Sequence, residues 1–278
     1  MSKPAVEWFV EGLRERGVKW ISTLCGHGLD PLFHAARQTG IRLVDTRNEQ
    51  TAGFAAEAFG RLTRSPGVCA VSSGVAVANA MSGLLNAWFD SAPMLLISGA
   101  AESGKFGLGA FQDLDQPGLT RPVTRWSATV DAPSRTLECL NEAWTHAQTG
   151  PAHLMLPMDV QRTGVDDADM AKPAASSGTV RRTATPQVLA AAELLAKASR
   201  PLIVAGTEIY CSREGSDLLA FADVFGIPVQ TPIWDRGLVN LDSQVFLGVV
   251  GAATGGPDLL AASDCILLAA DTSDYRTN

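Results

Sequence analysis

The sequence predicts an α/β fold in which helices cover both faces of a parallel sheet, followed by a second, smaller α/β unit. Short apolar runs alternate with longer amphipathic stretches from residue 20 onward. A polar, small-residue segment, DDADMAKPAASSGTVRRTA, interrupts this alternation once, and the alternation then resumes. We therefore expect a first domain over residues 1–165, a linker over 166–185 and a partial central domain over 186–278.

The first domain is expected to contain five strands joined by crossover helices. The strands are predicted at Trp20–Leu24, Arg42–Asp45, Val68–Ser72, Met94–Ser98 and His153–Pro157. The helices are predicted at Ala5–Arg16, Pro31–Thr39, Asn48–Leu62, Val75–Phe89 and Pro133–Gln148. Five strands with helices of this length between them suit one parallel sheet.

The second unit repeats the pattern on a smaller scale and is expected to be Rossmann-like. Helices are predicted at Pro186–Lys197 and Gly215–Phe225, and strands at Leu202–Ala205, Val229–Thr231 and Cys265–Ala269. The last predicted strand lies close to residue 278. Because a buried parallel strand without a covering helix exposes apolar surface, we expect further polypeptide to complete this unit.

Composition narrows the classes of function. The net charge is −7 and Lys and Arg form no run, so neither nucleic acid nor an anionic membrane is an expected partner. The five cysteines are scattered and form no CxxC or Cys/His cluster, which argues against a disulfide framework and a zinc site. No metal ligands are expected in this chain. The N-terminal residues lack the pattern of a signal peptide, and we expect a cytoplasmic protein that acts on small molecules.

Glu49 is the first residue whose position in the sequence suggests a role in ligand binding. It follows the predicted strand Arg42–Asp45 and lies in the first turn of the predicted helix Asn48–Leu62. This position is at the carboxyl edge of the sheet, where open α/β folds bind ligands. The alternative is that the carboxylate only complements the helix dipole.

Six collinear blocks over about 160 residues resemble the thiamine diphosphate (ThDP) enzymes of the acetolactate synthase and 2-hydroxyacyl-CoA lyase group. The block around Glu49 reads RNEQTAGFAAEAFGRLT, where that family has Arg-His-Glu-Gln and a small-residue helix ending in Tyr-Ala-Arg. The other blocks are CGHGLD (25–30), Asn79 with Gly83, DSAP before MLLISG (90–99), AFQDLD before RPVTRW (110–126) and GPAHLMLPMDVQ (150–161). After the linker, RPLIVAG, GIPVQT and residues 262–275 are similar to the start of the family's central domain. The resemblance implies a pyrimidine-binding domain followed by part of that central domain.

The resemblance assigns a role to Glu49. In the family the matching carboxylic acid shares a proton with N1′ of the cofactor's aminopyrimidine ring, which prepares the ring's amino group to take a proton from C2 of the thiazolium. By the same resemblance, Glu49, Gly26, Gly74 and Asn79 are expected to bind the cofactor.

Two further residues are candidates for catalysis by the same resemblance. Gln112 matches a glutamine near the reacting carbon, where an amide can donate to or accept from a substrate oxygen. A loop glutamine without such a role is the alternative. His27 stands between two glycines and could transfer a proton, although a histidine in a Gly-rich turn often serves the backbone only.

Two departures from the family limit what the resemblance implies. Most relatives have Gly-Pro-Gly where this chain has Gly74-Val-Ala76, so the local backbone could differ. The family's Mg²⁺ and diphosphate signature, Gly-Asp-Gly followed by Asn-Asn, is missing from the sequence. The Gly-rich segment 251–256 is the one candidate replacement, and a turn is its alternative interpretation.

These features predict an enzyme that needs a partner. A second subunit is expected to bear the Mg²⁺ and diphosphate site, in a dimer of heterodimers, although a fragment of a longer chain would look the same. The expected chemistry makes or breaks a carbon–carbon bond beside a carbonyl, with acetolactate-synthase-like decarboxylation and carboligation of a 2-oxo acid as the first hypothesis. A lyase acting on a 2-hydroxyacyl-CoA is the alternative, and a non-catalytic structural or regulatory subunit is the third. A nicotinamide dinucleotide site is not expected, because Gly26-His-Gly28 lacks the third glycine of GxGxxG.

Overall fold

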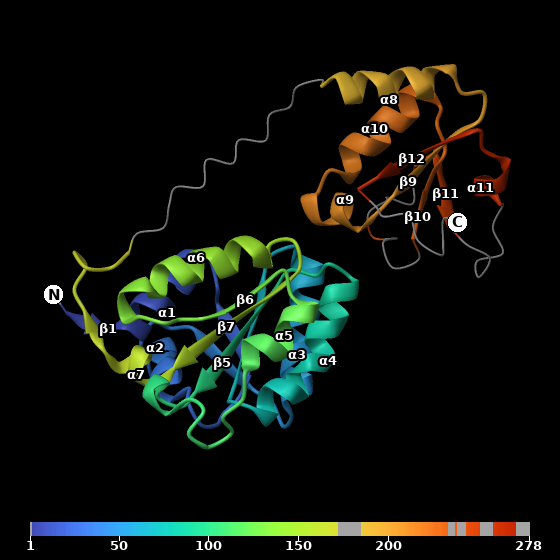
Figure 1. Ribbon diagram of the computed structural model, residues 1–278. Helices are drawn as coiled ribbons and strands as arrows, with labels where there is room; N and C mark the ends of the chain where they lie inside the picture. The colour runs from blue at the N-terminus through green and yellow to red at the C-terminus, as the bar shows by residue number, and fades with distance from the viewer. Residues whose placement is uncertain (1, 172–184, 233–236, 238–242, 251–257, 271–278) are drawn as a thin grey trace. The chain divides into compact units, whose positions relative to one another are not determined.

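The computed structural model describes residues 2–171, 185–232, 237, 243–250 and 258–270. The chain divides into two compact units, Met1–Ser176 and Ser177–Asn278, and the elements of each are shown in Figure 1. Each unit is built on a parallel sheet flanked by helices, so the predicted fold class is confirmed. The predicted boundaries 1–165, 166–185 and 186–278 remain predictions, because residues 172–184 lie outside the described part of the chain.

The first unit contains a six-stranded parallel sheet in the order β3-β2-β4-β5-β7-β6. Its strands are β2 (Trp20–Leu24), β3 (Arg42–Asp45), β4 (Gly67–Val71), β5 (Met94–Ala100), β6 (Trp126–Thr129) and β7 (Pro151–Pro157). The expected number of five strands was wrong, because β6 was not predicted. β6 pairs with β7 alone at the edge of the sheet and is only half-buried. An edge strand of this kind needs no continuous apolar run, so its sequence WSAT gave no strand signal.

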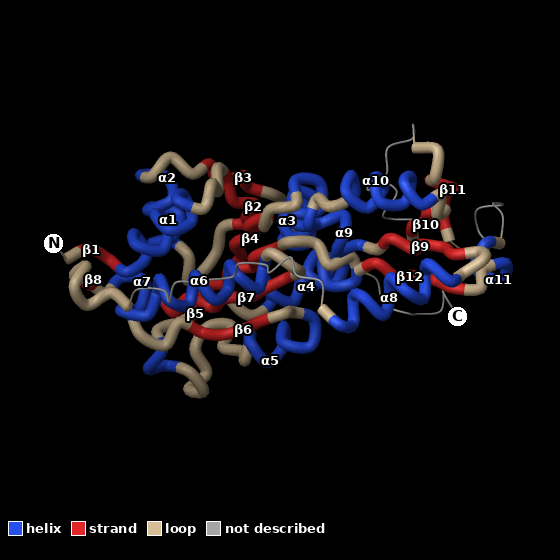
Figure 2. The backbone as a smooth tube through the Cα atoms, turned by 90° about the horizontal axis from the view of Figure 1, so that it is seen from above, coloured by secondary structure: helices blue, strands red, loops and turns tan. Residues whose placement is uncertain are grey.

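Helices cover both faces of this sheet (Figures 1 and 2). One face is covered by α1 (Ala5–Glu15), α2 (Asp30–Gln38) and α6 (Thr136–Ala147). The other is covered by α3 (Glu49–Thr63), α4 (Val75–Phe89) and α5 (Gln116–Thr120). Alternate residues of β4 point to the two cores: Val68 and Ala70 enter the first, and Cys69 and Val71 enter the second. This two-sided burial explains why β4 reads as a continuous run of small and apolar residues.

Small residues bring α3 and α4 together. A Cβ atom added to Gly83 of α4 would lie only 2.4 Å from the carbonyl carbon of Gly53 of α3. The two helix backbones therefore approach more closely than larger side chains would permit. This contact sets the spacing between the start of α3 and the side chains of α4.

Shorter elements complete the first unit. β1 (Lys3–Pro4) pairs with β8 (Gly164–Val165) in an antiparallel sheet of two strands, and α7 (Met158–Arg162) follows β7. Met170, which is 4% exposed, packs with Ala5 and Val165. Residues up to 171 of the expected linker thus contact the first unit.

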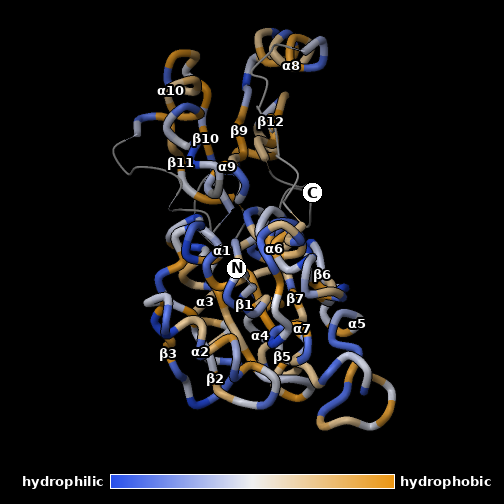
Figure 3. The backbone as a smooth tube through the Cα atoms, turned by 90° about the vertical axis from the view of Figure 1, so that its left-hand side faces the viewer, coloured by the Kyte–Doolittle hydropathy of each residue, from blue (hydrophilic) through white to orange (hydrophobic). Residues whose placement is uncertain are grey.

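The second unit has a parallel sheet in the order β11-β10-β9-β12. Its strands are β9 (Pro201–Ala205), β10 (Val229–Thr231), β11 (Phe246–Val249) and β12 (Cys265–Ala269), and its helices are α8 (Pro186–Lys197), α9 (Thr207–Ser212), α10 (Gly215–Phe225) and α11 (Leu259–Ala262). The central strand β9 is strongly hydrophobic (Figure 3). The three short elements α9, β11 and α11 were not predicted. Among the described residues of the chain, no helix combines the length and apolar character needed to cross a bilayer.

Candidate functional site

The predicted site residues follow four neighbouring strands at one edge of the first sheet. Glu49 comes after β3, Gly26 and His27 after β2, Gly74 after β4, and Gln112 in the loop after β5. These strands are adjacent in the order β3-β2-β4-β5. Because the strands are parallel, the segments that follow them leave the sheet at the same carboxyl edge.

The turn between β3 and α3 places Glu49 at the helix start. Asn48 caps α3, since its side-chain oxygen accepts a hydrogen bond from the backbone N–H of Gln50 at 2.8 Å. The Thr46 hydroxyl lies within hydrogen-bond distance of two carbonyl oxygens, that of Thr23 at 3.0 Å and that of Asn48 at 2.9 Å. The turn is thereby attached to the end of β2, and Glu49 occupies the first helical position.

Side chains of α4 contact this helix start directly. Asn79 Nδ2 donates a hydrogen bond to Glu49 Oε2 at 3.0 Å. Gln50 Nε2 donates to Ser82 Oγ at 2.9 Å, one turn further along α4. Within the described residues, Glu49 Oε1 has no hydrogen-bond partner. The half-buried carboxylate is thus held by one oxygen, and the other is available to a donor.

Gln112 lies against the end of β4. Its φ angle is +53°, a left-handed conformation that is uncommon for residues other than glycine. The Ser73 hydroxyl lies 3.4 Å from Gln112 Oε1. Gly74 has φ +57°, and a Cβ atom at this position would lie 2.8 Å from Gln112 Cβ. Only glycine at position 74 permits this approach.

His27 and Gly26 lie beside the same group of residues. The exposed His27 ring meets the Phe111 ring edge to face, with centroids 5.5 Å apart. The Ser72 hydroxyl donates to the His27 carbonyl oxygen at 2.8 Å. A Cβ atom at Gly26 would lie 2.6 Å from Ser72 Cβ, so packing alone accounts for this glycine. The structure therefore groups Glu49 with Asn79, and groups His27 and Gln112 around Phe111, Ser73 and Gly74.

The loop that carries Gln112 is attached at both ends. Asp159 accepts hydrogen bonds from the Ser103 backbone N–H at 3.0 Å and from the Ser103 hydroxyl at 2.5 Å. Partial burial favours the neutral acid, but these hydrogen bonds outweigh it and hold the pKa of Asp159 below its usual range. At the other end, Gln116 Nε2 donates to the Gly99 carbonyl oxygen at 3.0 Å.

A buried histidine fastens α5, which follows this loop, to the sheet. His153 Nε2 lies 2.8 Å from Ser98 Oγ, and Nδ1 lies 2.9 Å from both Thr120 Oγ1 and Ser127 Oγ. Complete burial lowers the pKa of His153 to about 3, so the ring is neutral at physiological pH. The structure therefore gives His153 a packing role.

Comparisons with known proteins decide the family. The model for the thiamine pyrophosphate enzyme N-terminal TPP binding domain matches residues 4–119, and the model for the central domain of the same enzymes matches residues 188–278. The chain belongs to the thiamine pyrophosphate enzyme family. Thiamine pyrophosphate is another name for ThDP, so the resemblance drawn from the sequence is confirmed.

Individual relatives of this family cover nearly the whole chain. A probable acetolactate synthase large subunit from Methanocaldococcus jannaschii is 31% identical over 95% of the chain and 46% of its own length. Human 2-hydroxyacyl-CoA lyase 2 is 31% identical over 95% of the chain and 47% of its length. A probable 2-ketoarginine decarboxylase from Pseudomonas aeruginosa is 31% identical over 95% of the chain and 48% of its length. The chain thus spans about half the length of the relatives it matches.

The residues around Glu49 fit the pyrimidine end of ThDP. A carboxylate with one oxygen fixed by Asn79 and one oxygen available can receive a ring N–H, as an aminopyrimidine requires. The structure shows no comparable fit for Mg²⁺. Among the residues that it describes, no group of three or more His, Cys, Asp and Glu side chains could hold a metal ion. The Gly-rich segment 251–256 lies outside the described residues.

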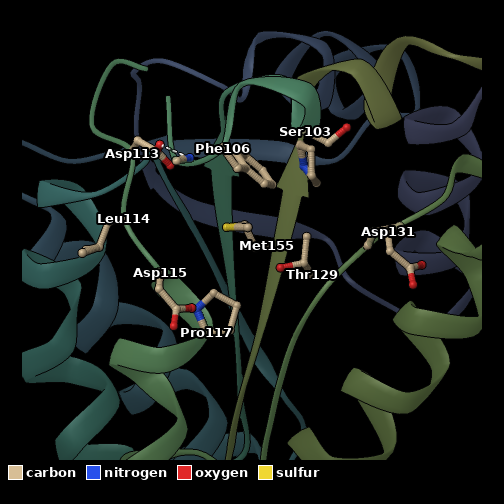
Figure 4. A pocket seen from close by; sticks show the side chains of 12 residues that line it. Ser103, Phe106, Asp113, Leu114, Asp115, Pro117, Thr129, Asp131 and Met155 are labelled. Atoms are coloured by element: carbon tan, nitrogen blue, oxygen red, sulfur yellow. Dashed lines mark hydrogen bonds between the residues drawn. The ribbon is translucent and has the colours of Figure 1, made fainter. Parts of the chain in front are cut away.

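The structure adds residues that the sequence did not point to. Ser73 contacts the predicted residue Gln112, and Thr46 contacts Asn48, the residue before Glu49. Both follow strands at the carboxyl edge, which was the available signal. A pocket of about 660 Å³ also lies beside the Gln112 loop, and Figure 4 shows Phe106, Met155 and Thr129 around it. Asp113 and Leu114, which follow Gln112, line this pocket, whereas the predicted site residues do not.

Proposed function

We propose that this chain supplies the pyrimidine-binding half of the active site of a ThDP enzyme that makes or breaks a carbon–carbon bond beside a carbonyl. One observation carries the proposal: Glu49 starts α3 at the carboxyl edge of the sheet, and Asn79 holds one of its carboxylate oxygens at 3.0 Å. When bound, ThDP supplies carbanion stabilisation next to a carbonyl. The side chains of this chain would orient the cofactor and manage protons around it.

Each site residue has a distinct role in this proposal. Glu49 shares a proton with a ring nitrogen of the aminopyrimidine, and Asn79 holds the carboxylate in the orientation needed. Gln112 binds a substrate oxygen through its amide. His27, exposed beside Phe111, is placed to exchange protons with bound substrate. Gly26 and Gly74, which pack closely against Ser72 and Gln112, are proposed from the family resemblance to line the cofactor site.

The remaining parts of the site are proposed to lie on other polypeptide. Mg²⁺ and the diphosphate would be bound by a second subunit in a dimer of heterodimers, or else by further residues of a longer chain. The fact that the chain spans about half the length of its relatives supports this division. We propose that the assembly is cytoplasmic.

The substrate is proposed to be a 2-oxo acid, handled by acetolactate-synthase-like decarboxylation and carboligation. The relative from Methanocaldococcus jannaschii supports this choice. Cleavage of a 2-hydroxyacyl-CoA is the second candidate, supported by the human relative. Product analysis of the assembled enzyme separates the two: pyruvate should give a carboligation product, whereas the second candidate requires turnover of a 2-hydroxyacyl-CoA to an aldehyde.

Cofactor binding tests the division of the site. ThDP is titrated into the purified chain with Mg²⁺, alone and together with the polypeptide that bears Gly-Asp-Gly and Asn-Asn. We expect tight, Mg²⁺-dependent binding only in the second case. Tight binding by the chain alone would contradict the requirement for other polypeptide.

A further inference from the structure

We infer that Ser73 is a positioning residue, which turns the Gln112 side-chain amide so that its NH₂ group, and not its oxygen, faces the substrate. The inference deepens the proposed function and rests on it, because it concerns how Gln112 would meet a substrate oxygen. Ser73 is only 1% exposed and lies two residues after the end of β4. Its hydroxyl lies 3.4 Å from Gln112 Oε1.

The backbone of Gln112 is fixed by its neighbours, so only its side chain is free to turn. The residue has φ +53°, and its Cβ would lie 2.8 Å from any Cβ at position 74. Phe111, the preceding residue, packs its ring against His27. Gly74 and Phe111 hold the backbone of Gln112 in place. A neighbouring side chain can therefore still determine which end of the Gln112 amide, Oε1 or NH₂, faces it.

The hydroxyl hydrogen of Ser73 decides that direction. A buried hydroxyl can donate one hydrogen bond, and among the described residues Gln112 Oε1 is the acceptor within reach of it. If the amide turned over, its NH₂ would face the Ser73 oxygen, and the hydroxyl hydrogen would lose its acceptor. An unpaired buried donor is costly, so the arrangement with Oε1 toward Ser73 is favoured.

This orientation has a consequence for substrate choice. With Oε1 engaged, the NH₂ group of the half-buried Gln112 is free of hydrogen bonds within the described residues, and it can only donate. The site should therefore prefer an oxygen that accepts, such as the carbonyl or carboxylate oxygen of a 2-oxo acid. Without Ser73, the amide could present either end, and this preference would weaken.

The test combines kinetics with a direct view of the amide. In the assembled enzyme, kcat/KM for a 2-oxo acid is measured for Ser73→Ala, Gln112→Leu and the double variant. In the 278-residue chain labelled with ¹⁵N-glutamine, the side-chain NH₂ signals of Gln112 are assigned by their loss in Gln112→Leu. Ser72→Ala is the matched control, because that hydroxyl bonds to the His27 carbonyl and not to Gln112.

We expect Ser73→Ala to lower kcat/KM about fivefold in the wild-type background and to have almost no effect once Gln112 is Leu, since a residue acting through another shows this coupling. We also expect it, unlike Ser72→Ala, to shift the Gln112 NH₂ signals, and Ser73→Thr to restore them. An equal loss in both backgrounds, or unshifted NH₂ signals, would overturn the inference. A wild-type assembly without carbon–carbon bond activity would instead contradict the proposed function, while the NH₂ signals would still report on Ser73.

Discussion

The side-chain amide of Asn79 donates a hydrogen bond to Oε2 of Glu49 across 3.0 Å, and so joins the middle of α4 to the first turn of α3. These residues are 30 positions apart in the sequence, and the close approach of Gly53 to Gly83 brings their helices together. The contact leaves one oxygen of the carboxylate without a partner among the described residues. The fold thus presents one unpaired carboxylate oxygen at the carboxyl edge of the sheet, where we propose that ThDP binds.

The first prediction concerns Glu49 itself. Glu49→Gln removes the acid but keeps its size, and it should lower turnover of the assembled enzyme at least about a hundredfold, as proton-transfer groups commonly contribute that much. The midpoint of thermal unfolding should stay the same, because the side chain is only half-buried. Turnover close to that of the wild type would refute the role of Glu49 and favour a structural or regulatory subunit.

The second prediction concerns the approach of Gly74 to Gln112. Gly74→Ala should reduce the free energy of unfolding by about 1 to 3 kcal/mol, since its φ of +57° disfavours a side chain, and the new Cβ would collide with Gln112. It should also lower kcat/KM by displacing Gln112. Gly17→Ala is the control, because Gly17 has φ +84° but open space around it. Urea unfolding and kinetics of both variants measure the difference, and equal kcat/KM values in the two would contradict the account.

The third prediction is a pH dependence that arises from His153. Burial lowers its pKa to about 3, so the unfolded chain binds the proton more tightly than the folded one. Stability supplied by the neutral ring is complete above the ordinary histidine pKa and is lost as the pH falls toward 3. The free energy of unfolding should therefore decrease by up to about 1.4 kcal/mol per pH unit below pH 6.

His153→Leu tests this assignment. The variant should be less stable at pH 7, because three hydroxyl groups lose a partner, but it should lack that part of the acid dependence. His34→Gln, at an exposed position, controls for the removal of a histidine. Urea unfolding at pH 7, 6 and 5 provides the comparison. If the free energy of unfolding fell equally with pH in the wild type and in His153→Leu, the His153 ring would not be the source of this acid dependence.

The fourth prediction concerns Glu57, which is buried in α3. Burial raises its pKa, and the nearby Asp90 carboxylate raises it further, against the opposing effects of Arg61 and Asn86. Stability gained from the raised pKa is present below the ordinary glutamate pKa and is lost as the pH rises through the folded value. Glu57→Gln, which mimics the neutral acid, should therefore unfold at a higher temperature than the wild type at pH 7.5, but not at pH 4. A lower unfolding temperature at pH 7.5 would contradict this.

Much of the first unit could be predicted from local sequence patterns. The inner strands β4 and β5 place apolar residues on both faces, and α4 begins directly after Gly74, so each was recognisable without knowledge of its neighbours. The edge strand β6 was missed because Trp126–Thr129 is a strand only through its pairing with β7. Its residues carry no pattern of their own.

The candidate site was predictable in its residues but not in its contacts. Glu49, Gln112 and His27 stood out because each lies in a block that resembles a family motif after a strand. The bond from Asn79 to Glu49 and the contact of Ser73 with Gln112 join residues 30 and 39 positions apart. Such contacts depend on helix packing and on a left-handed residue in a loop, which local patterns do not encode.

The structure of the assembled enzyme with ThDP and Mg²⁺ tests the central claim most directly. We expect the Glu49 carboxylate within about 3 Å of a ring nitrogen of the aminopyrimidine, a normal hydrogen-bond distance. The claim would be contradicted if this carboxylate faced bulk water with the aminopyrimidine bound elsewhere.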